Sequence, residues 1–194
     1  MDGTYGNLAY KEEPRTEIIG GKVVMFAAPS GVHEDVVDNI RDIFRDYLRG
    51  KPCRVFSSNR AVFLADGEVY LPDVKVVCDR SKIKADGIHG APDLVVEVLS
   101  PSTGRYDRGR KMQVYERCGV REYWIVEPVN RSIEQYVLED GRFIIRGFYK
   151  LCDELDLKMM SEKERAEVTS AFHCTLFEDL TITVEDVFAD VVQF

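Results

Sequence analysis

The chain has 194 residues, of which 45% are hydrophobic, and it carries a formal charge of −8 at pH 7. This length and hydrophobic content suffice for one packed core, so we expect a single domain over residues 1–194 and exclude a disordered chain. The acidic balance argues against a protein that holds nucleic acid by bulk electrostatics, because non-specific affinity comes from Lys and Arg side chains that neutralise phosphates.

The five cysteines are widely spaced, and none forms the close pair that a zinc site needs. This spacing predicts reduced, mostly buried thiols at Cys53, Cys78, Cys118, Cys152 and Cys174. Residues 1–14 are polar and lack the apolar stretch of a signal peptide, so we expect a flexible leader there. No apolar run approaches the roughly 20 residues that span a bilayer, which predicts a soluble cytoplasmic protein.

The first regular element that we predict is a β-hairpin over residues 17–26, whose two short strands flank Gly20-Gly21. An amphipathic helix follows over 30–49, because apolar residues recur there at spacings of three and four. Ser30 is its expected N-cap, and Gly50 ends it. The next segment predicts strands over 54–56, 61–64 and 69–78, and then a polar loop over 80–90.

A nearly continuous apolar strand over 94–99 is typical of the centre of a sheet. A helix over 106–118, ended by Gly119, and a strand over 122–127 come next. The rest predicts a hairpin over 132–138 and 142–149, a short helix over 161–168, a strand or turn over 172–177 and a helical turn over 184–189. Helices that cover a mixed sheet make this an α/β or α+β fold.

Glu97 is the lone charge in the central strand, where an unpaired buried charge costs several kcal/mol, roughly, unless a cation or hydrogen bonds compensate it. If the strand with Asp73 pairs antiparallel to it, and Cys78 lies opposite Pro92, then Asp73 lies opposite Glu97. Their Cβ atoms are then about 5 Å apart on one face, close enough to hold one Mg²⁺ or Mn²⁺ through oxygen ligands.

Two alternatives stay open for these carboxylates. A lone Glu in a strand is more often paired with a structural Lys or Arg than with a metal ion. Asp93 has the same parity as Glu97, so it either joins the site at its edge or caps the end of the strand, and capping is favoured.

A combination of segments then extends over nearly the whole chain: 17–21, 28–30 with His33, 71–74, 91–103, Asp107, Lys111, Tyr115 and 119–128. Together these segments resemble the Uma-two family of restriction-endonuclease-like proteins. The resemblance implies the PD-(D/E)XK nuclease core, in which an Asp after Pro and a Glu on the next strand hold the metal, and a Lys two residues on assists the attacking water. The matching positions are Asp73 and Glu97.

The sequence departs from that core at the third position, where Leu99 stands in place of lysine. In the family the lysine moves to the following helix, where this chain has Lys111, and a helix packed after the strand can deliver its ammonium group to the same space. The alternative is that Lys111 belongs to a solvated helix face with Arg108 and Arg110. Lys75 is a further, less favoured substitute.

Three other residues complete the predicted site. Glu17 matches the acidic N-terminal position of the family, which implies a metal ligand or general base; without the resemblance it is an exposed strand residue. His33 begins a helix, where it contacts a substrate phosphate, positions Glu17 or makes a local hydrogen bond. Arg108 is predicted to meet a nucleic-acid backbone as part of a basic stripe formed by Arg105, Arg108, Arg110 and Lys111.

These features predict a metal-dependent endonuclease in which Asp73 and Glu97 bind Mg²⁺ or Mn²⁺, Lys111 aligns the nucleophile or stabilises charge, and Glu17 assists. Fold analogy supplies nucleic acid, and DNA in particular, as the substrate. One rival is a non-catalytic module that keeps the fold and binds a partner, and another is an enzyme that acts on a small phosphoester. A homodimer is expected, since many nucleases of this fold need two sites for two strands.

Overall fold

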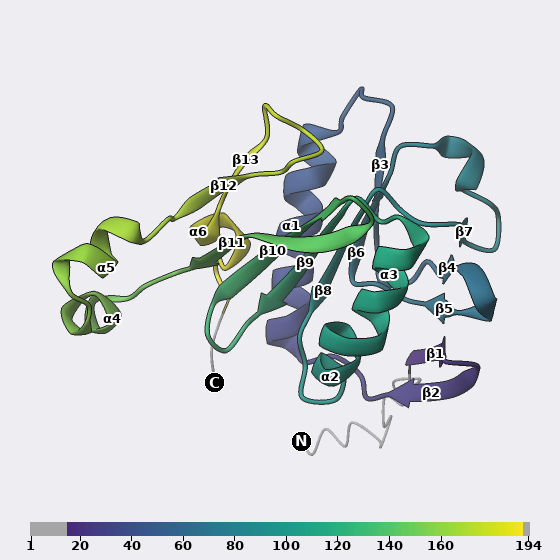
Figure 1. The fold of residues 1–194 in the computed structure, drawn as a ribbon, viewed down its shortest axis with the longest axis horizontal. Helices are drawn as coiled ribbons and strands as arrows, with labels where there is room; N and C mark the ends of the chain where they lie inside the picture. The colour runs from purple at the N-terminus through teal and green to yellow at the C-terminus, as the bar shows by residue number, and fades with distance from the viewer. Residues whose placement is uncertain (1–14, 192–194) are drawn as a thin grey trace, which may run out of the picture.

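The computed structural model describes residues 15–191, so the leader expected over 1–14 lies outside the described residues. A six-stranded mixed sheet in the order β11-β10-β9-β8-β6-β3 forms its centre (Figure 1). Neighbouring strands run antiparallel except β8 and β9, which are parallel. The strands are β3 (Arg54–Ser57), β6 (Val74–Val77), β8 (Leu94–Val98), β9 (Glu122–Glu127), β10 (Ser132–Glu139) and β11 (Arg142–Lys150).

Two smaller sheets flank the central one. The five-stranded sheet has the order β2-β1-β5-β4-β7, and a two-stranded sheet pairs β12 with β13. The strands of these sheets are β1 (Arg15–Ile19), β2 (Lys22–Phe26), β4 (Val62–Phe63), β5 (Val69–Tyr70), β7 (Ile88–His89), β12 (Ala171–His173) and β13 (Thr181–Thr183).

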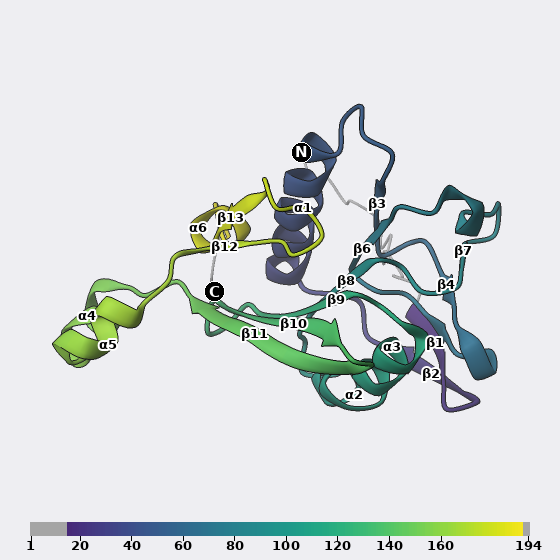
Figure 2. The ribbon, with the colours of Figure 1, turned by 45° about the horizontal axis from the view of Figure 1, so that its top comes forward.

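Helices cover both faces of the central sheet, as Figure 2 shows. Helix α1 (Gly31–Tyr47) lies on one face, and the crossover from β8 to β9 lies on the other. This crossover consists of α2 (Gly104–Tyr106), a π-helical turn η3 (Asp107–Lys111) and α3 (Met112–Cys118). The parallel pairing of β8 and β9 requires such a crossover.

Short helices complete the chain: η1 (Ala65–Gly67), η2 (Arg80–Lys82), α4 (Glu154–Met159), α5 (Glu162–Glu167) and α6 (Val184–Val187). Helices α4 and α5 project away from the body in both ribbon views (Figures 1 and 2). Within residues 15–191, no helix combines the length and apolar character needed to cross a bilayer.

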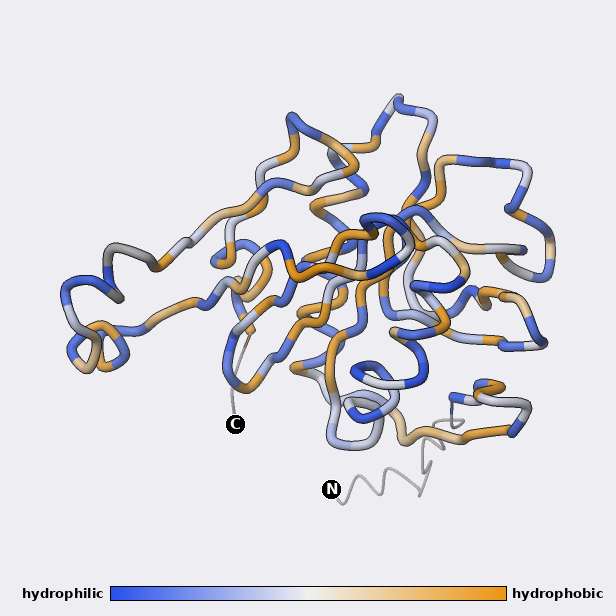
Figure 3. The backbone as a smooth tube through the Cα atoms, in the orientation of Figure 1, coloured by the Kyte–Doolittle hydropathy of each residue, from blue (hydrophilic) through white to orange (hydrophobic). Residues whose placement is uncertain are grey.

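The central strands bury side chains on both faces, which explains their nearly continuous apolar sequences. One core lies between the sheet and α1, where Val96 packs with Ile40, Phe44 and Trp124. The other lies between the sheet and α3 and includes Val95, Tyr115, Tyr123 and Ile125. Figure 3 shows the hydrophobic segments concentrated along these strands in the middle of the molecule.

Most of the predicted elements are present. The hairpin at Gly20-Gly21 forms β1 and β2, and the Ser30 hydroxyl caps α1 by accepting a hydrogen bond from the His33 N–H. The strand predicted over 69–78 is divided into β5 and β6, and the loop predicted over 80–90 contains η2 and β7. Helix α4 and strand β13 were not predicted, because segments as short as these are too brief to show a distinct periodicity.

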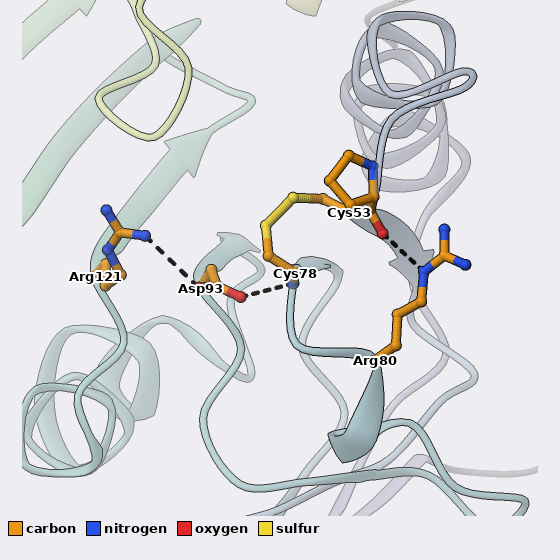
Figure 4. The surroundings of a disulfide bond; sticks show 6 residues. Cys53, Cys78, Arg80, Asp93 and Arg121 are labelled. Atoms are coloured by element: carbon orange, nitrogen blue, oxygen red, sulfur yellow. Dashed lines mark hydrogen bonds and ion pairs between the residues drawn. A yellow bond between two sulfur atoms is a disulfide. The ribbon is translucent and has the colours of Figure 1, made fainter.

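The cysteine prediction is wrong for two residues. Cys53 and Cys78 form a disulfide, whereas Cys118, Cys152 and Cys174 are free thiols. Of these three, Cys174 is buried as predicted, but Cys118 and Cys152 are partly exposed. The two bonded residues lie directly beyond the paired positions Arg54 and Val77 of β3 and β6, so strand pairing sets them opposite each other (Figure 4). Their separation of 25 residues gives no sign of this pairing in the sequence. The cytoplasmic location stays a prediction.

A buried carboxylate fastens the C-terminal segment to the central sheet. Glu122 is 0% exposed, and its Oε1 accepts hydrogen bonds from Trp124 Nε1 and Gln135 Nε2, each at 2.7 Å. Its Oε2 accepts from the backbone N–H groups of Thr175 at 2.8 Å and Leu176 at 3.2 Å. Because these donors are satisfied by one side chain, Glu122 determines where the segment after β12 docks.

We expect Glu122→Ala to lower the free energy of unfolding by about 3–5 kcal/mol, since it leaves several buried donors without an acceptor. Urea denaturation followed by circular dichroism measures the change. Glu127→Ala, at the partly exposed end of the same strand, is the control and should alter stability little. Equal losses in the two variants would contradict this role of Glu122.

Candidate functional site

Asp73 and Glu97 face each other across the two central strands, as the predicted register requires. Val74 pairs with Val96, and Lys75 pairs with Val95. One further step in this register places Asp73 opposite Glu97 on the same face of the sheet. Both residues are buried, with exposed fractions of 5% and 2%. The predicted register is therefore confirmed.

The Asp73 carboxylate is held from four directions. Its Oδ1 accepts hydrogen bonds from Arg15 Nη1 at 3.0 Å and Ser58 Oγ at 3.4 Å. Its Oδ2 accepts from the Val98 N–H at 2.9 Å and lies 3.2 Å from His33 Nε2. Burial by itself would raise the pKa of Asp73, but the contacts with His33 and the Val98 N–H lower it to about 2. The Asp73 carboxylate is thus ionised and fixed in position.

Lys111 lies at the centre of three carboxylates. Its Nζ is 3.0 Å from Glu17 Oε2, 3.2 Å from Glu97 Oε1 and 3.2 Å from Asp107 Oδ1. Its side chain is only 3% exposed. Burial tends to lower the pKa of Lys111, but the three carboxylates together raise it well above its usual range. The ammonium group therefore stays charged inside the protein.

Glu97 has a second partner in the crossover between β8 and β9. The Tyr115 hydroxyl donates a hydrogen bond of 2.7 Å to Glu97 Oε1, the oxygen that Lys111 also contacts. Burial raises the pKa of Glu97 well above the usual range of a carboxyl group, and the charge of Lys111 opposes that shift. Glu97, the acidic position that the resemblance implies, is thus paired with Lys111, the relocated lysine.

The interpretation of Lys111 as part of a solvated helix face is wrong, and so is that of Glu17 as an exposed strand residue. Glu17 is 3% exposed, and its Oε1 accepts a hydrogen bond from the Leu71 N–H at 2.7 Å. Strand β1 of the small sheet thereby brings a third carboxylate to the central strands. Lys75 is also fully buried; it donates to the Pro72 carbonyl, and burial lowers its pKa to about 7.

Asp107 belongs to this cluster, although our sequence analysis assigned it no role. It is 1% exposed, and neither of its carboxylate oxygens has a hydrogen-bond partner among the described residues apart from the ion pair with Lys111. The signal that could have found it is its spacing of four residues from Lys111, which places both side chains on one face of a helical segment.

The remaining predicted residues lie elsewhere or contact different partners. His33 contacts Asp73 rather than Glu17. Asp93 caps the other end of the strand by accepting from the Cys78 N–H at 2.8 Å, with Arg121 3.8 Å away (Figure 4). The basic stripe is dispersed: Lys111 is buried, Arg108 pairs with Glu134 at 2.6 Å, and Arg110 pairs with Glu68 at 2.5 Å.

A small cavity of about 30 Å³ is lined by Asp73, Glu97, Glu17 and Lys111 together with Arg15 and His33. The buried oxygens Glu17 Oε2, Asp107 Oδ1 and Asp107 Oδ2 lack hydrogen bonds among the described residues. Four carboxyl groups, those of Asp73, Glu97, Glu17 and Asp107, here lie close to three basic side chains, those of Arg15, Lys75 and Lys111.

This donor set fits a hard divalent cation held by few protein ligands. Over residues 15–191, no group of three or more His, Cys, Asp or Glu side chains is arranged to hold a metal ion by itself. Mg²⁺ does not need such a cage, because it usually binds through one or two carboxylates and keeps several waters. The opposed carboxylates of Asp73 and Glu97 supply this number of protein ligands beside the cavity.

Comparisons with known proteins identify the family of the chain. The Uma2 (Uma-two) family, described as "Putative restriction endonuclease", matches residues 4–165 of the chain. An uncharacterized protein of Synechocystis sp. is 30% identical over 151 residues, which cover 76% of this chain and 79% of that protein. A second uncharacterized Synechocystis protein is 25% identical over 126 residues, or 63% of this chain and 71% of its own length.

The fold is also found in a solved structure. It is that of "a putative nuclease belonging to DUF820" from Anabaena variabilis, with a TM-score of 0.71 and 17% identity over 93% of each chain. This likeness confirms the expected fold class, a mixed sheet flanked by helices.

We expect Lys111→Met to lower the free energy of unfolding by about 3–5 kcal/mol, because it leaves buried carboxylates without a compensating charge. The matched control is Lys158→Met, which removes an ammonium group that also pairs with a carboxylate four residues away but is 73% exposed. This control should alter stability little. Thermal and urea unfolding measure both changes, and similar midpoints for the two variants would show that Lys111 holds no such cluster together.

Proposed function

We propose that this chain, which belongs to the Uma2 family of restriction-endonuclease-like proteins, is a metal-dependent endonuclease. It would hydrolyse phosphodiester bonds of nucleic acid. The observation that carries the proposal is the opposition of Asp73 and Glu97 on paired central strands, with Lys111 beside Glu97. These residues match the two acidic positions and the relocated lysine of the nuclease core.

Asp73 and Glu97 would hold Mg²⁺ or Mn²⁺. When bound, the ion would polarise a phosphoryl oxygen and make an attacking water more acidic. The protein supplies fixed oxygen donors for this purpose: hydrogen bonds from the Val98 N–H and contact with His33 orient Asp73 and keep it ionised. His33 is therefore proposed as a positioning residue.

Lys111 would act on the nucleophile or on the developing charge. Its ammonium group is held by carboxylates from three separate segments, so its position is fixed before substrate binds. A preorganised cation stabilises charge on a phosphoryl group without the cost of reorientation. Glu17 holds Lys111 through Oε2 and would assist as a further ligand or general base.

Several finer features rest on analogy with nucleases of this fold. They are DNA as the substrate, one catalytic domain over residues 1–194, and a homodimer that presents two sites to two strands. Arg108 is 44% exposed and pairs with Glu134, so any contact that it makes with substrate would lie outside the carboxylate cluster.

Isothermal titration of Mg²⁺ or Mn²⁺ into metal-free protein, with a parallel plasmid-nicking assay, tests the proposal. We expect Asp73→Asn and Glu97→Gln to abolish metal binding and to slow nicking roughly 100-fold or more, because each removes an oxygen ligand. Asp93→Asn is the matched control, since this carboxylate lies on the same strand face as Glu97 but contacts Cys78 and Arg121 instead.

The outcomes separate the proposal from its rivals. Metal binding without nicking, together with cleavage of a small phosphoester, would assign the site to a different substrate. A folded wild-type protein that binds no metal and nicks no plasmid would favour the non-catalytic module. Equal losses in all three variants would mean that the assay reports folding rather than the site.

A further inference from the structure

A groove leads from the carboxylate cavity along helix α1 and the edge strand β3. Its near section, of about 230 Å³, shares Arg15 and His33 with the cavity. Its outer section, of about 440 Å³, shares Arg41 and Ser57 with the near section. The shared lining residues show that the cavity and the two sections adjoin one another. Both ribbon views show α1 alongside β3 (Figures 1 and 2).

The outer section is basic, although the whole chain is acidic. Arg41, Arg45, Arg49 and Arg54 line it, and no Asp or Glu is among its lining residues. Arg41 and Arg45 lie one helical turn apart on α1, and Arg49 follows just past its end, so their spacing along the axis is about 6 Å. A row of guanidinium groups suits an extended polyanion rather than one small phosphoester.

The acidic neighbours of these arginines do not cancel the row. Arg41 pairs with Asp38 and Asp42, Arg45 with Asp42, and Arg49 with Asp46. The Asp side chains are 54–74% exposed, and exposed ion pairs of this kind contribute little and are screened by salt. A guanidinium group has five N–H donors, so it can exchange such a partner for a phosphate.

We propose that this arginine groove holds the phosphate backbone of the nucleic-acid substrate and leads it to the carboxylate cavity. The inference rests on the proposed nuclease function and adds to it the path of the strand: along α1 and β3, past Arg41 and Arg15, to Asp73. It also accounts for nucleic-acid binding by a chain with a formal charge of −8, since the contact is local.

The test compares two double variants that remove the same charge. Arg45→Ala with Arg49→Ala removes two groove arginines that are 57% and 79% exposed. Arg117→Ala with Arg142→Ala removes two arginines on α3 and β11 that are 50% and 79% exposed and also paired with acidic residues. All four side chains lie outside the carboxylate cavity, so Mg²⁺ titration should give the wild-type result for both variants.

Fluorescence anisotropy of a labelled DNA duplex, in EDTA and over a range of salt concentrations, measures binding without cleavage. We expect the groove variant to bind roughly tenfold more weakly and to lower the slope of log K against log salt by about 2, because two phosphate contacts are lost. The plasmid-nicking rate of this variant at subsaturating DNA should fall by the same factor. The control variant should match the wild type in both assays.

Two results would contradict the proposed role of the groove, and a third would contradict the nuclease function on which it rests. The groove is rejected if both variants bind the duplex as tightly as the wild type, or if both lose affinity equally. In either case, nicking by the wild-type protein would leave the nuclease function in place. A wild-type protein that binds Mg²⁺ but neither binds nor nicks DNA rejects nucleic acid as the substrate, and the groove with it.

Discussion

The structure around the site depends on the cost of burying the ammonium group of Lys111. A charge that is only 3% exposed requires compensation, and the protein supplies it with Glu17, Glu97 and Asp107. These carboxylates come from β1 of the small sheet, β8 of the central sheet and the turn η3 of the crossover. The same interaction therefore joins three parts of the fold and fixes the geometry of the site.

The relocated lysine also explains the shape of the crossover. Leu99 follows β8 and packs in the core beneath α3, so an apolar side chain occupies the position where the nuclease core has its lysine. The ammonium group instead enters from η3, a π-helical turn between α2 and α3. This turn is kinked at Gly109, whose φ of −117° and ψ of −106° are not helical. Here the turn buries Asp107 and Lys111 together, so both reach the end of β8.

The sequence was informative wherever a strong periodicity or a single register decided the structure. The nearly continuous apolar run over 94–99 predicted a strand at the centre of the sheet, and β8 is buried along its whole length as expected. One register then placed Asp73 opposite Glu97. The contact between His33 and Asp73 and the disulfide between Cys53 and Cys78 were not predicted from the sequence. Both depend on how α1 and β3 dock against β6, and neither the helix nor the edge strand carries a local signal of its partner.

The charge distribution shows why composition alone gave an incomplete account of binding. Between residues 38 and 49, Asp38, Asp42 and Asp46 alternate with Arg41, Arg45 and Arg49, so any window within this segment is close to neutral. A helix separates the two kinds of residue onto neighbouring lines, and the strand packed beside it decides which line borders the groove. The arginines border it beside β3, whereas the net charge sums over faces that a ligand never meets together. An acidic chain can therefore present a basic surface to a polyanion, provided that helix docking rather than composition determines that surface.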